Sequence, residues 1–210
     1  MKLFLASALD KMKDQLLAEV GSLQDKKIAY CINPADERTA IEWTDIRWLK
    51  NDRDMLVECG ADLVPVDLRV MQGEELKLVL ESCDMLFVSG GDTNYFLKLA
   101  HESGYATLLP DLIGRQQKVY LSTSAGSCVM GSFVRAYAAD GSITELIPGF
   151  WYYQTMMVPH RWRGTAFNKA KYLWQMERLF DEGWSFLALT DYQAIVVEEH
   201  WMRIVTAASK

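Results

Sequence analysis

The sequence is short of the residues that mark several classes of protein. It contains only three histidines and four cysteines in 210 residues, and the cysteines form no CxxC pair. Metal sites and disulfide frameworks draw on paired Cys and His, so this composition indicates neither a metal, nor another cofactor, nor a disulfide. We expect the cysteines to be small buried thiols in a reducing compartment.

Long apolar runs and basic blocks are also lacking. No stretch approaches the roughly 20 apolar residues of a membrane span, and the apolar run at the N-terminus is too short for a signal peptide. Acidic residues exceed basic ones by 28 to 22, for a formal charge of −6, which argues against nucleic acid. We therefore expect a cytoplasmic protein with no nucleic-acid or membrane partner, either a monomer or a homodimer.

What the sequence does contain is a regular alternation of short apolar runs and longer helix-like segments. Half of its residues are apolar, enough for the core of one domain spanning residues 1–210. The predicted strands that open the chain are Lys2–Leu5, Lys27–Ile32, Leu63–Val66, Met85–Val88 and Lys118–Leu121. Helices are predicted after Ser7 as a cap, over 37–60 with an interruption at 50–54, and over 73–82, 95–102 and 167–182.

Strands that alternate with helices predict the α/β class, with a mostly parallel sheet flanked by helices. Three further strands, near Phe186–Leu189, Ala194–Val197 and Arg203–Thr206, follow one another closely. We expect these to form an antiparallel or mixed edge of the sheet.

The fifth predicted strand runs into a loop of small residues around Ser124, with the sequence Ser-Thr-Ser-Ala-Gly-Ser. It nearly matches the G-x-S-x-G nucleophile elbow, with Ser122 in place of the first glycine. Such a turn needs small residues because it is sharp, and it exposes the hydroxyl while presenting backbone N–H groups. The same composition is also typical of an ordinary loop in which the other hydroxyls cap the next helix.

A second loop of small residues, Ser-Gly-Gly-Asp-Thr at 89–93, follows the fourth predicted strand. Its paired glycines let the backbone approach a ligand closely, although a tight turn with Asp92 as a helix cap explains them equally well. No phosphate-binding motif accompanies them. Because ligands lie beyond the carboxyl ends of parallel strands, the two loops together can supply a nucleophile and two N–H groups for an oxyanion hole.

One of the three histidines is well placed to serve as the base for Ser124. His101 lies on a predicted helix and His200 in a predicted hairpin turn, so both are expected at the surface. His160 follows an apolar run and Pro159, at the carboxyl end of a predicted strand. We interpret His160 as the candidate base, with a structural histidine as the alternative.

An acid that orients the imidazole should come from a nearby loop. Asp140, in the sequence Ala-Ala-Asp-Gly, lies between the nucleophile and His160. An Asp-Gly turn explains it equally well, and Glu145 and Asp191 remain as alternatives.

Taken together, these residues resemble peptidase family S51, which contains the aspartyl dipeptidase peptidase E and the cyanophycinases. The likeness rests on the Ser-Gly-Gly-Asp-Thr loop, the Thr-Ser-Ala-Gly elbow, the Pro159-His160 step and the closing segment that begins at Asp191. It implies a flavodoxin-like sheet similar to that of class I glutamine amidotransferases. It also implies cleavage of small peptides after aspartate, through an acyl-enzyme.

The resemblance also assigns roles to individual residues. It implies that Ser124 is the nucleophile, His160 the general base and Asp140 the acid. Gly91 and Ala125 would give their backbone N–H groups to the oxyanion hole.

An aspartyl substrate needs a cation near the nucleophile, and arginine grips carboxylates bidentately. Arg161 and Arg163, which follow the histidine, are candidate substrate-binding residues, with Arg135 as a further candidate. Asp92 of the glycine loop is a candidate substrate contact as well. Each arginine is otherwise a solvated surface charge.

Two other functions fit the sequence less well. An α/β-hydrolase esterase needs more chain between nucleophile and histidine than lies between Ser124 and His160, and no HGGG-type motif is present. The alternative from another class is a non-catalytic binding protein on the same fold, whose seven tryptophans serve a partner surface.

Overall fold

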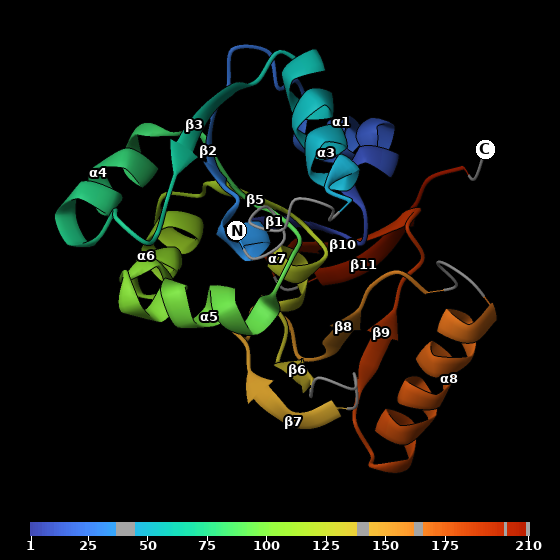
Figure 1. The fold of residues 1–210 in the computed structure, drawn as a ribbon. Helices are drawn as coiled ribbons and strands as arrows, with labels where there is room; N and C mark the ends of the chain where they lie inside the picture. The colour runs from blue at the N-terminus through green and yellow to red at the C-terminus, as the bar shows by residue number, and fades with distance from the viewer. Residues whose placement is uncertain (37–44, 138–142, 162–165, 200, 209–210) are drawn as a thin grey trace.

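The computed structural model describes residues 1–36, 45–137, 143–161, 166–199 and 201–208. A seven-stranded sheet runs through the centre, in the order β11-β10-β1-β5-β4-β2-β3 (Figure 1). Its strands are β1 (Lys2–Ala6), β2 (Lys27–Cys31), β3 (Asp62–Val66), β4 (Met85–Val88), β5 (Val119–Thr123), β10 (Gln193–Glu198) and β11 (Trp201–Thr206).

The first five strands of the chain are mutually parallel, and the last two are antiparallel. β3, β2, β4, β5 and β1 pair in parallel, whereas β10 pairs antiparallel with both β1 and β11. The predicted α/β class is confirmed, and so is the antiparallel C-terminal edge for β10 and β11. The third strand predicted for this edge, near Phe186–Leu189, is not part of the central sheet. The carboxyl ends of β1, β4 and β5 therefore meet at one edge of the sheet, where a ligand site is expected.

Helices cover both faces of the sheet (Figure 1). α1 and α3 lie on one face, and α4, α5 and α6 lie on the other. The helices are α1 (Lys13–Val20), α3 (Arg47–Glu58), α4 (Gly73–Ser82), α5 (Thr93–Glu102), α6 (Tyr105–Leu109), α7 (Ala125–Cys128) and α8 (Ala166–Asp181), with short turns η1 (Leu9–Lys11), η2 (Asn33–Ala35) and η3 (Pro110–Arg115).

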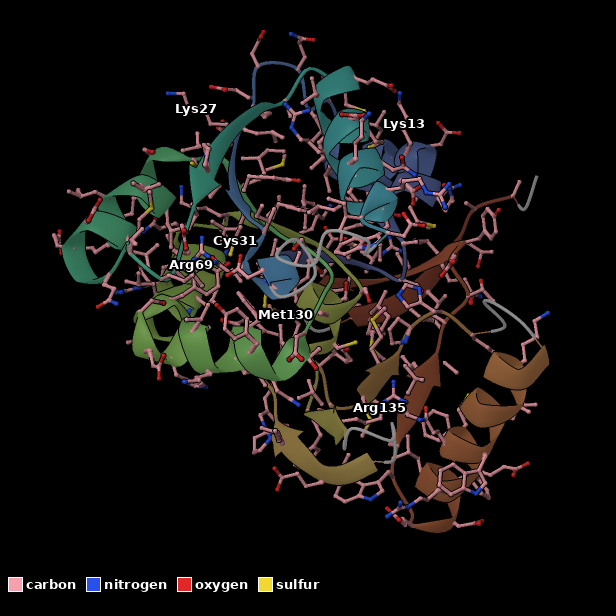
Figure 2. The ribbon with its side chains drawn as sticks, viewed as in Figure 1. Lys13, Lys27, Cys31, Arg69, Met130 and Arg135 are labelled. Carbon is pink, nitrogen blue, oxygen red and sulfur yellow. The ribbon has the colours of Figure 1, made fainter. Side chains whose placement is uncertain are left out.

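The central strands are buried on both faces, with an apolar core on each side of the sheet. On β1, Leu3 and Leu5 point into the core under α4–α6, and Phe4 and Ala6 point into the core under α1 and α3. This alternation follows from the two-residue repeat of a strand, and it explains why the strand sequences are continuous apolar runs. Figure 2 shows Cys31 inside the molecule, whereas the Lys27 side chain lies at the periphery.

Two small sheets stand beside the central one. β6 (Phe133–Tyr137) and β7 (Ile143–Pro148) form an antiparallel hairpin, and β8 (Met156–Val158) pairs in parallel with β9 (Phe186–Ala188). The sequence analysis missed the hairpin, because neither strand is a continuous apolar run.

Two helix predictions needed correction. The first helix does not begin at Ser7; the chain first forms η1, and α1 begins only at Lys13. α3 runs without a break through residues 50–54, where the polar sequence had predicted an interruption. The described part of the chain contains no helix long and apolar enough to cross a membrane.

α3 tolerates its polar stretch because Asp52 is buried against the amino end of η1. Asp52 is 2% exposed, and its Oδ1 accepts a hydrogen bond of 2.8 Å from the backbone N–H of Asp10. Burial raises the pKa of Asp52 to about 7, and the hydrogen bond from Asp10 opposes that rise only in part.

The raised pKa of Asp52 predicts how the free energy of unfolding depends on pH. Between about pH 4 and 7 the unfolded chain loses the Asp52 proton while the folded chain keeps it, so the free energy of unfolding falls by about 1.4 kcal/mol per pH unit from this group. Asp52→Asn cannot ionise and keeps an acceptor oxygen, so it removes that slope. Urea denaturation from pH 4.5 to 8 measures the difference between wild type and variant.

The control for this measurement is Asp14→Asn, which changes an exposed carboxylate on α1. We expect the Asp14 variant to keep the wild-type slope. A constant difference between wild type and Asp52→Asn across the pH range would contradict the prediction.

Candidate active site

Ser124 lies at the sharp turn between β5 and α7, at the carboxyl edge of the central sheet. Its φ of +48° is unusual for a residue with a Cβ. The Ser124 N–H donates to the carbonyl of Ala6 at 2.9 Å, which ties the turn to the end of β1. This is the strained strand-to-helix geometry that the elbow motif predicts, and it turns the hydroxyl outward.

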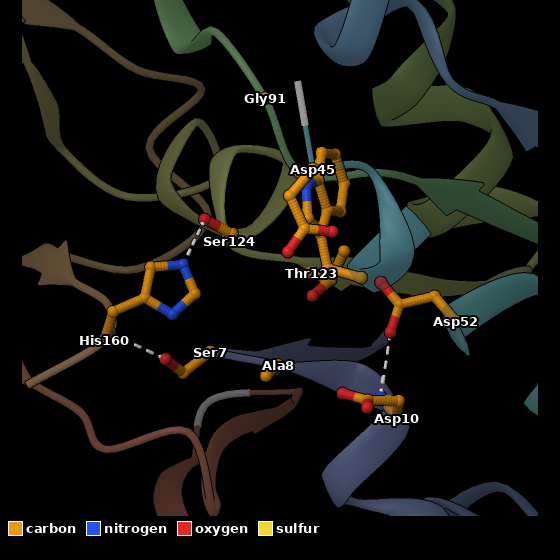
Figure 3. A pocket seen from close by; sticks show the side chains of 11 residues that line it. Ser7, Ala8, Asp10, Asp45, Asp52, Gly91, Thr123, Ser124 and His160 are labelled. Atoms are coloured by element: carbon orange, nitrogen blue, oxygen red, sulfur yellow. Dashed lines mark hydrogen bonds between the residues drawn. The ribbon is translucent and has the colours of Figure 1, made fainter. Parts of the chain in front are cut away.

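His160 follows β8 and reaches the Ser124 hydroxyl from the other side of the site (Figure 3). Its Nε2 lies 2.9 Å from Ser124 Oγ, within hydrogen-bond reach. Its φ is +63°, so the histidine also occupies the left-handed region. The two side chains that the sequence predicts as nucleophile and base are therefore in direct contact, and their roles stay predictions.

The carboxylate on the far side of the imidazole belongs to Asp191. Its Oδ1 lies 2.6 Å from His160 Nδ1. Asp140, the acid that the sequence analysis preferred, lies outside the described residues, and Glu145 is exposed on β7. The sequence analysis had considered Asp191 only as an alternative. The geometry favours Asp191, because the 2.6 Å distance identifies its Oδ1 as the acceptor of the hydrogen bond that His160 Nδ1–H donates.

The double-glycine loop passes close to the nucleophile. A Cβ on Gly90 would lie 3.2 Å from Ser124 Cβ, and one on Gly91 would lie 1.9 Å from the carbonyl oxygen of Pro34. Gly91 has a φ of +138°, so both its conformation and its surroundings require glycine. Neither the Gly91 N–H nor the Ala125 N–H donates a hydrogen bond to another residue of the described chain.

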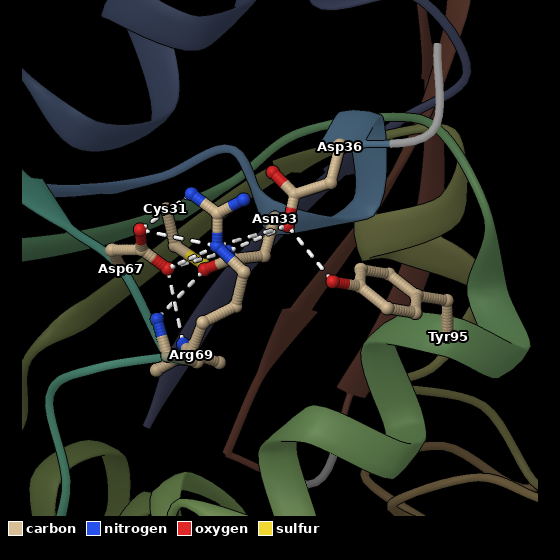
Figure 4. A network of polar contacts seen from close by, with 7 residues as sticks. Cys31, Asn33, Asp36, Asp67, Arg69 and Tyr95 are labelled. Atoms are coloured by element: carbon tan, nitrogen blue, oxygen red, sulfur yellow. Dashed lines mark hydrogen bonds and ion pairs between the residues drawn. The ribbon is translucent and has the colours of Figure 1, made fainter. Parts of the chain in front are cut away.

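The glycine loop rests on the η2 turn, which is held from outside by a polar network (Figure 4). Asn33 is 2% exposed, and its Nδ2 donates to Asp36 Oδ2 and to Asp67 Oδ1, each at 2.9 Å. Tyr95 Oη donates to Asp36 at 3.1 Å, and Arg69 hydrogen-bonds to Asp67. The Arg69 guanidinium, helped by Asn33, holds the pKa of Asp67 well below its usual range.

The contact between that turn and the loop is a backbone hydrogen bond. The Asp92 N–H donates to the carbonyl of Pro34 at 2.7 Å, and Asp92 Oδ1 accepts from the Tyr95 N–H at 2.8 Å. Asp92 is thus the cap of α5, the alternative role that the sequence allowed for it. A contact between Asp92 and substrate stays a prediction.

A cavity of about 370 Å³ opens on one side of Ser124 and His160 (Figure 3). Trp48 and the glycine loop form part of its wall. Three carboxyl-bearing residues also line it, Asp10, Asp45 and Asp52, and no Lys or Arg is found among its described lining residues. Asp10 pairs with Lys11 and Asp45 with Arg47, each at 2.7 Å, and Asp52 keeps its proton up to about pH 7, so this side offers carboxyl oxygens as hydrogen-bond acceptors more than a net negative charge.

A second cavity, of about 290 Å³, opens on the other side of the same two residues. Arg135 of β6 lines it together with Gln175, whose Oε1 lies 3.5 Å from Arg135 Nη1. Thr93 and the Ala125 backbone complete the part nearest the nucleophile. This cavity favours an anionic group, because a half-buried guanidinium lies beside it.

The other residues proposed from the sequence lie elsewhere. Arg161 is exposed and borders a separate cavity between α8 and β9, and Arg163 lies outside the described residues. His101 is exposed on α5, as expected, and His200 lies outside the described residues.

Sequence reasoning missed Ser7, Trp48 and Asp52, all of which line the first cavity. Ser7 carried a usable signal, because it directly follows a predicted central strand and so lies at the edge where ligands bind. The sequence around Trp48 and Asp52 gives no such signal, because the position of these side chains depends on how α3 packs against the sheet.

Comparison with known proteins identifies relatives of this chain in sequence and in fold. The model of peptidase family S51 matches residues 5–205. Among curated proteins, an uncharacterized peptidase of Pasteurella multocida strain Pm70 is 30% identical over 129 residues, which are 61% of this chain and 59% of that protein. The matched segment thus spans less than two thirds of the relative's length.

Two solved structures share the fold. A candidate peptidase E from Listeria monocytogenes EGD-e aligns with a TM-score of 0.78 over 99% of this chain and 98% of its own, at 19% identity. A peptidase from an acI-B1 actinobacterium aligns with a TM-score of 0.58 over 99% and 88%, at 16% identity. At these identities the likeness concerns the fold alone. Because the family model covers nearly the whole sequence, the chain belongs to peptidase family S51, a family of serine-type peptidases.

Proposed function

We propose that this protein hydrolyses short peptides after aspartate, with Ser124, His160 and Asp191 as the catalytic residues. The observation that carries the proposal is the continuous chain of contacts from Ser124 Oγ to His160 Nε2, at 2.9 Å, and from His160 Nδ1 to Asp191, at 2.6 Å. A hydroxyl, an imidazole and a carboxylate in this order are the parts that acyl transfer requires.

In the first step Ser124 Oγ attacks the carbonyl carbon of the peptide bond while His160 Nε2 takes the hydroxyl proton. Asp191 accepts the hydrogen bond from Nδ1–H and stabilises the imidazolium that forms. The carbonyl oxygen becomes an oxyanion, which the N–H groups of Gly91 and Ala125 receive. Their lack of any other hydrogen-bond acceptor in the described chain supports this role.

The tetrahedral intermediate then collapses. The C–N bond breaks, and the leaving amine takes the proton from His160, which leaves an acyl-enzyme on Ser124. Water adds to the acyl carbon, with His160 again as the base, and releases the acid product. Serine is regenerated with its proton.

The two cavities beside Ser124 support a short aspartyl peptide as substrate. The Arg135 cavity suits the aspartyl carboxylate, and the acidic cavity lined by Asp10, Asp45 and Asp52 suits the free amino group of a peptide N-terminus. Volumes of about 290 and 370 Å³ suit groups of a few atoms on each side of the scissile bond.

The nucleophile is tested with a fluorophosphonate probe and a dipeptide assay. Ser124→Ala abolishes labelling and lowers kcat by a factor on the order of 10⁴ or more, because no other hydroxyl takes its place at the imidazole. Ser82→Ala, which changes a serine at the end of α4, keeps both. If wild type is not labelled, or if Ser124→Ala is labelled equally, the protein is not a serine hydrolase and a binding role remains.

The identity of the acid is tested by comparing two substitutions. Asp191→Asn lowers kcat by about 10³- to 10⁴-fold. The neutral amide does not stabilise the imidazolium of His160, and its NH₂ group can donate to Nδ1, which favours the tautomer that cannot take the proton from Ser124. Asp140→Asn changes kcat by less than about tenfold. The reverse order of the two effects would restore Asp140 as the acid.

Substrate preference is tested with paired dipeptides that differ only in charge, Asp-Leu and Asn-Leu. Arg135→Gln lowers kcat/KM for Asp-Leu by about 10- to 100-fold, the value of a charge-assisted hydrogen bond, and changes that for Asn-Leu little. Arg161→Gln is the matched control, because this arginine borders another cavity. Equal losses for both dipeptides, or a larger effect from Arg161, would remove Arg135 from the substrate site.

A further inference from the structure

The hydroxyl of Ser7 contacts the candidate catalytic machinery without facing the reacting atoms. Ser7 is fully buried, immediately after β1. Its Oγ accepts a hydrogen bond of 2.8 Å from the His160 backbone N–H (Figure 3). It also lies 3.5 Å from Asp191 Oδ1, to which it donates. One side chain therefore contacts both the base and the acid.

We propose that Ser7 is a positioning residue that holds His160 and Asp191 in register with Ser124. The proposal rests on the proposed function, because it assumes that these three residues act together. It assigns to Ser7 no contact with the substrate carbonyl and no proton transfer.

The backbone of His160 shows why such a support is needed. With a φ of +63°, His160 occupies a region that residues with a Cβ adopt only when surrounding contacts hold them there. The Ser7 hydroxyl holds its N–H, and the next N–H, of Arg161, donates to the carbonyl of Leu189 at 2.8 Å. Without the Ser7 oxygen, His160 loses the acceptor that favours this conformation, and a change in φ swings the ring away from Ser124 Oγ.

Ser7 itself is fixed to the sheet and linked to the nucleophile through one peptide unit. Its N–H donates to the carbonyl of Gln193 at 3.0 Å, two residues after Asp191. The preceding carbonyl, of Ala6, accepts the Ser124 N–H at 2.9 Å. The end of β1 thus holds the nucleophile by a main-chain carbonyl and the base by the adjacent hydroxyl, so it fixes the distance between them.

The local helix does not use the Ser7 hydroxyl. η1 begins at Leu9 with Ala8 as its N-cap, and no side chain caps it. A cap role, which the sequence suggested, is therefore wrong. The described contacts of the hydroxyl are those to His160 and Asp191.

The test compares Ser7→Ala with Ser103→Ala. Ser103 is also buried, at the end of α5 and away from the site, and its Oγ likewise accepts a backbone N–H, that of Tyr105, at 3.3 Å. We expect Ser7→Ala to lower kcat on a dipeptide substrate by about 10- to 100-fold with KM within about threefold of wild type, as for a base displaced by a fraction of an ångström. We expect Ser103→Ala to stay within about twofold in kcat, and Ser7→Thr, which keeps the hydroxyl, to recover most of the loss.

A second measurement needs no substrate. The proton between His160 Nδ1 and Asp191 should give a low-field ¹H NMR resonance, since the two atoms lie 2.6 Å apart. In Ser7→Ala this resonance moves upfield or broadens by exchange with water, whereas in Ser103→Ala it stays in place. If Ser7→Ala does not fold, Ser7→Cys, which has nearly the same size and a poor acceptor, is compared in its place.

The outcomes separate this proposal from the proposed function. If wild type has no peptidase activity, the function fails, and the resonance alone still decides whether Ser7 positions the histidine. If Ser7→Ala keeps wild-type kcat and an unshifted resonance, or if its kcat falls no more than that of Ser103→Ala, the positioning role is overturned.

Discussion

The contact between Ser124 and His160 depends on the end of β1. The two residues come from different parts of the fold, one from the central sheet and one from the loop after the small β8–β9 sheet. Two adjacent residues at the end of β1 hold them: the Ala6 carbonyl accepts the Ser124 N–H at 2.9 Å, and the Ser7 hydroxyl accepts the His160 N–H at 2.8 Å. Burial of this strand on both faces makes it a rigid support, because close-packed interiors deform little.

Close approach of backbone to backbone governs the other half of the site. Gly91 passes so near to Pro34 that no Cβ fits between them, and the η2 turn is held by the side chain of Asn33. The Asn33 side chain also accepts the N–H of Leu68 at 2.9 Å, so the turn is tied to the end of β3 as well. The N–H group of Gly91, which we propose as part of an oxyanion hole, is therefore held in place by the fold itself, and preorganised dipoles act strongly on a developing charge.

The site also carries an asymmetry of charge. The cavity bounded by α3 and η1 has acidic side chains, and the cavity bounded by β6 and α8 has an arginine. Desolvation is the main cause of the raised pKa of Asp52, about 7, so water is largely excluded at that carboxyl, whereas Asp45 on the same side is exposed. Polar interactions are therefore strengthened only at the buried end of this cavity.

The parallel strands and the two loops at their carboxyl ends could be predicted from the sequence, because each depends on a short local pattern. Continuous apolar runs indicated the parallel strands, small residues after two of them indicated the nucleophile and glycine loops, and Pro159-His160 stood out because histidine is so scarce. The contact of Asp191 with His160, the burial of Asp52 and the contacts of Ser7 were decided only by the tertiary structure. Asp191 contacts Ser7, 184 residues away in the chain, because β10 pairs antiparallel with β1. Asp52 is buried because its carboxyl accepts a hydrogen bond from the backbone N–H of Asp10. Such contacts join residues distant in the chain, and no short sequence pattern records which distant partner a polar side chain will find.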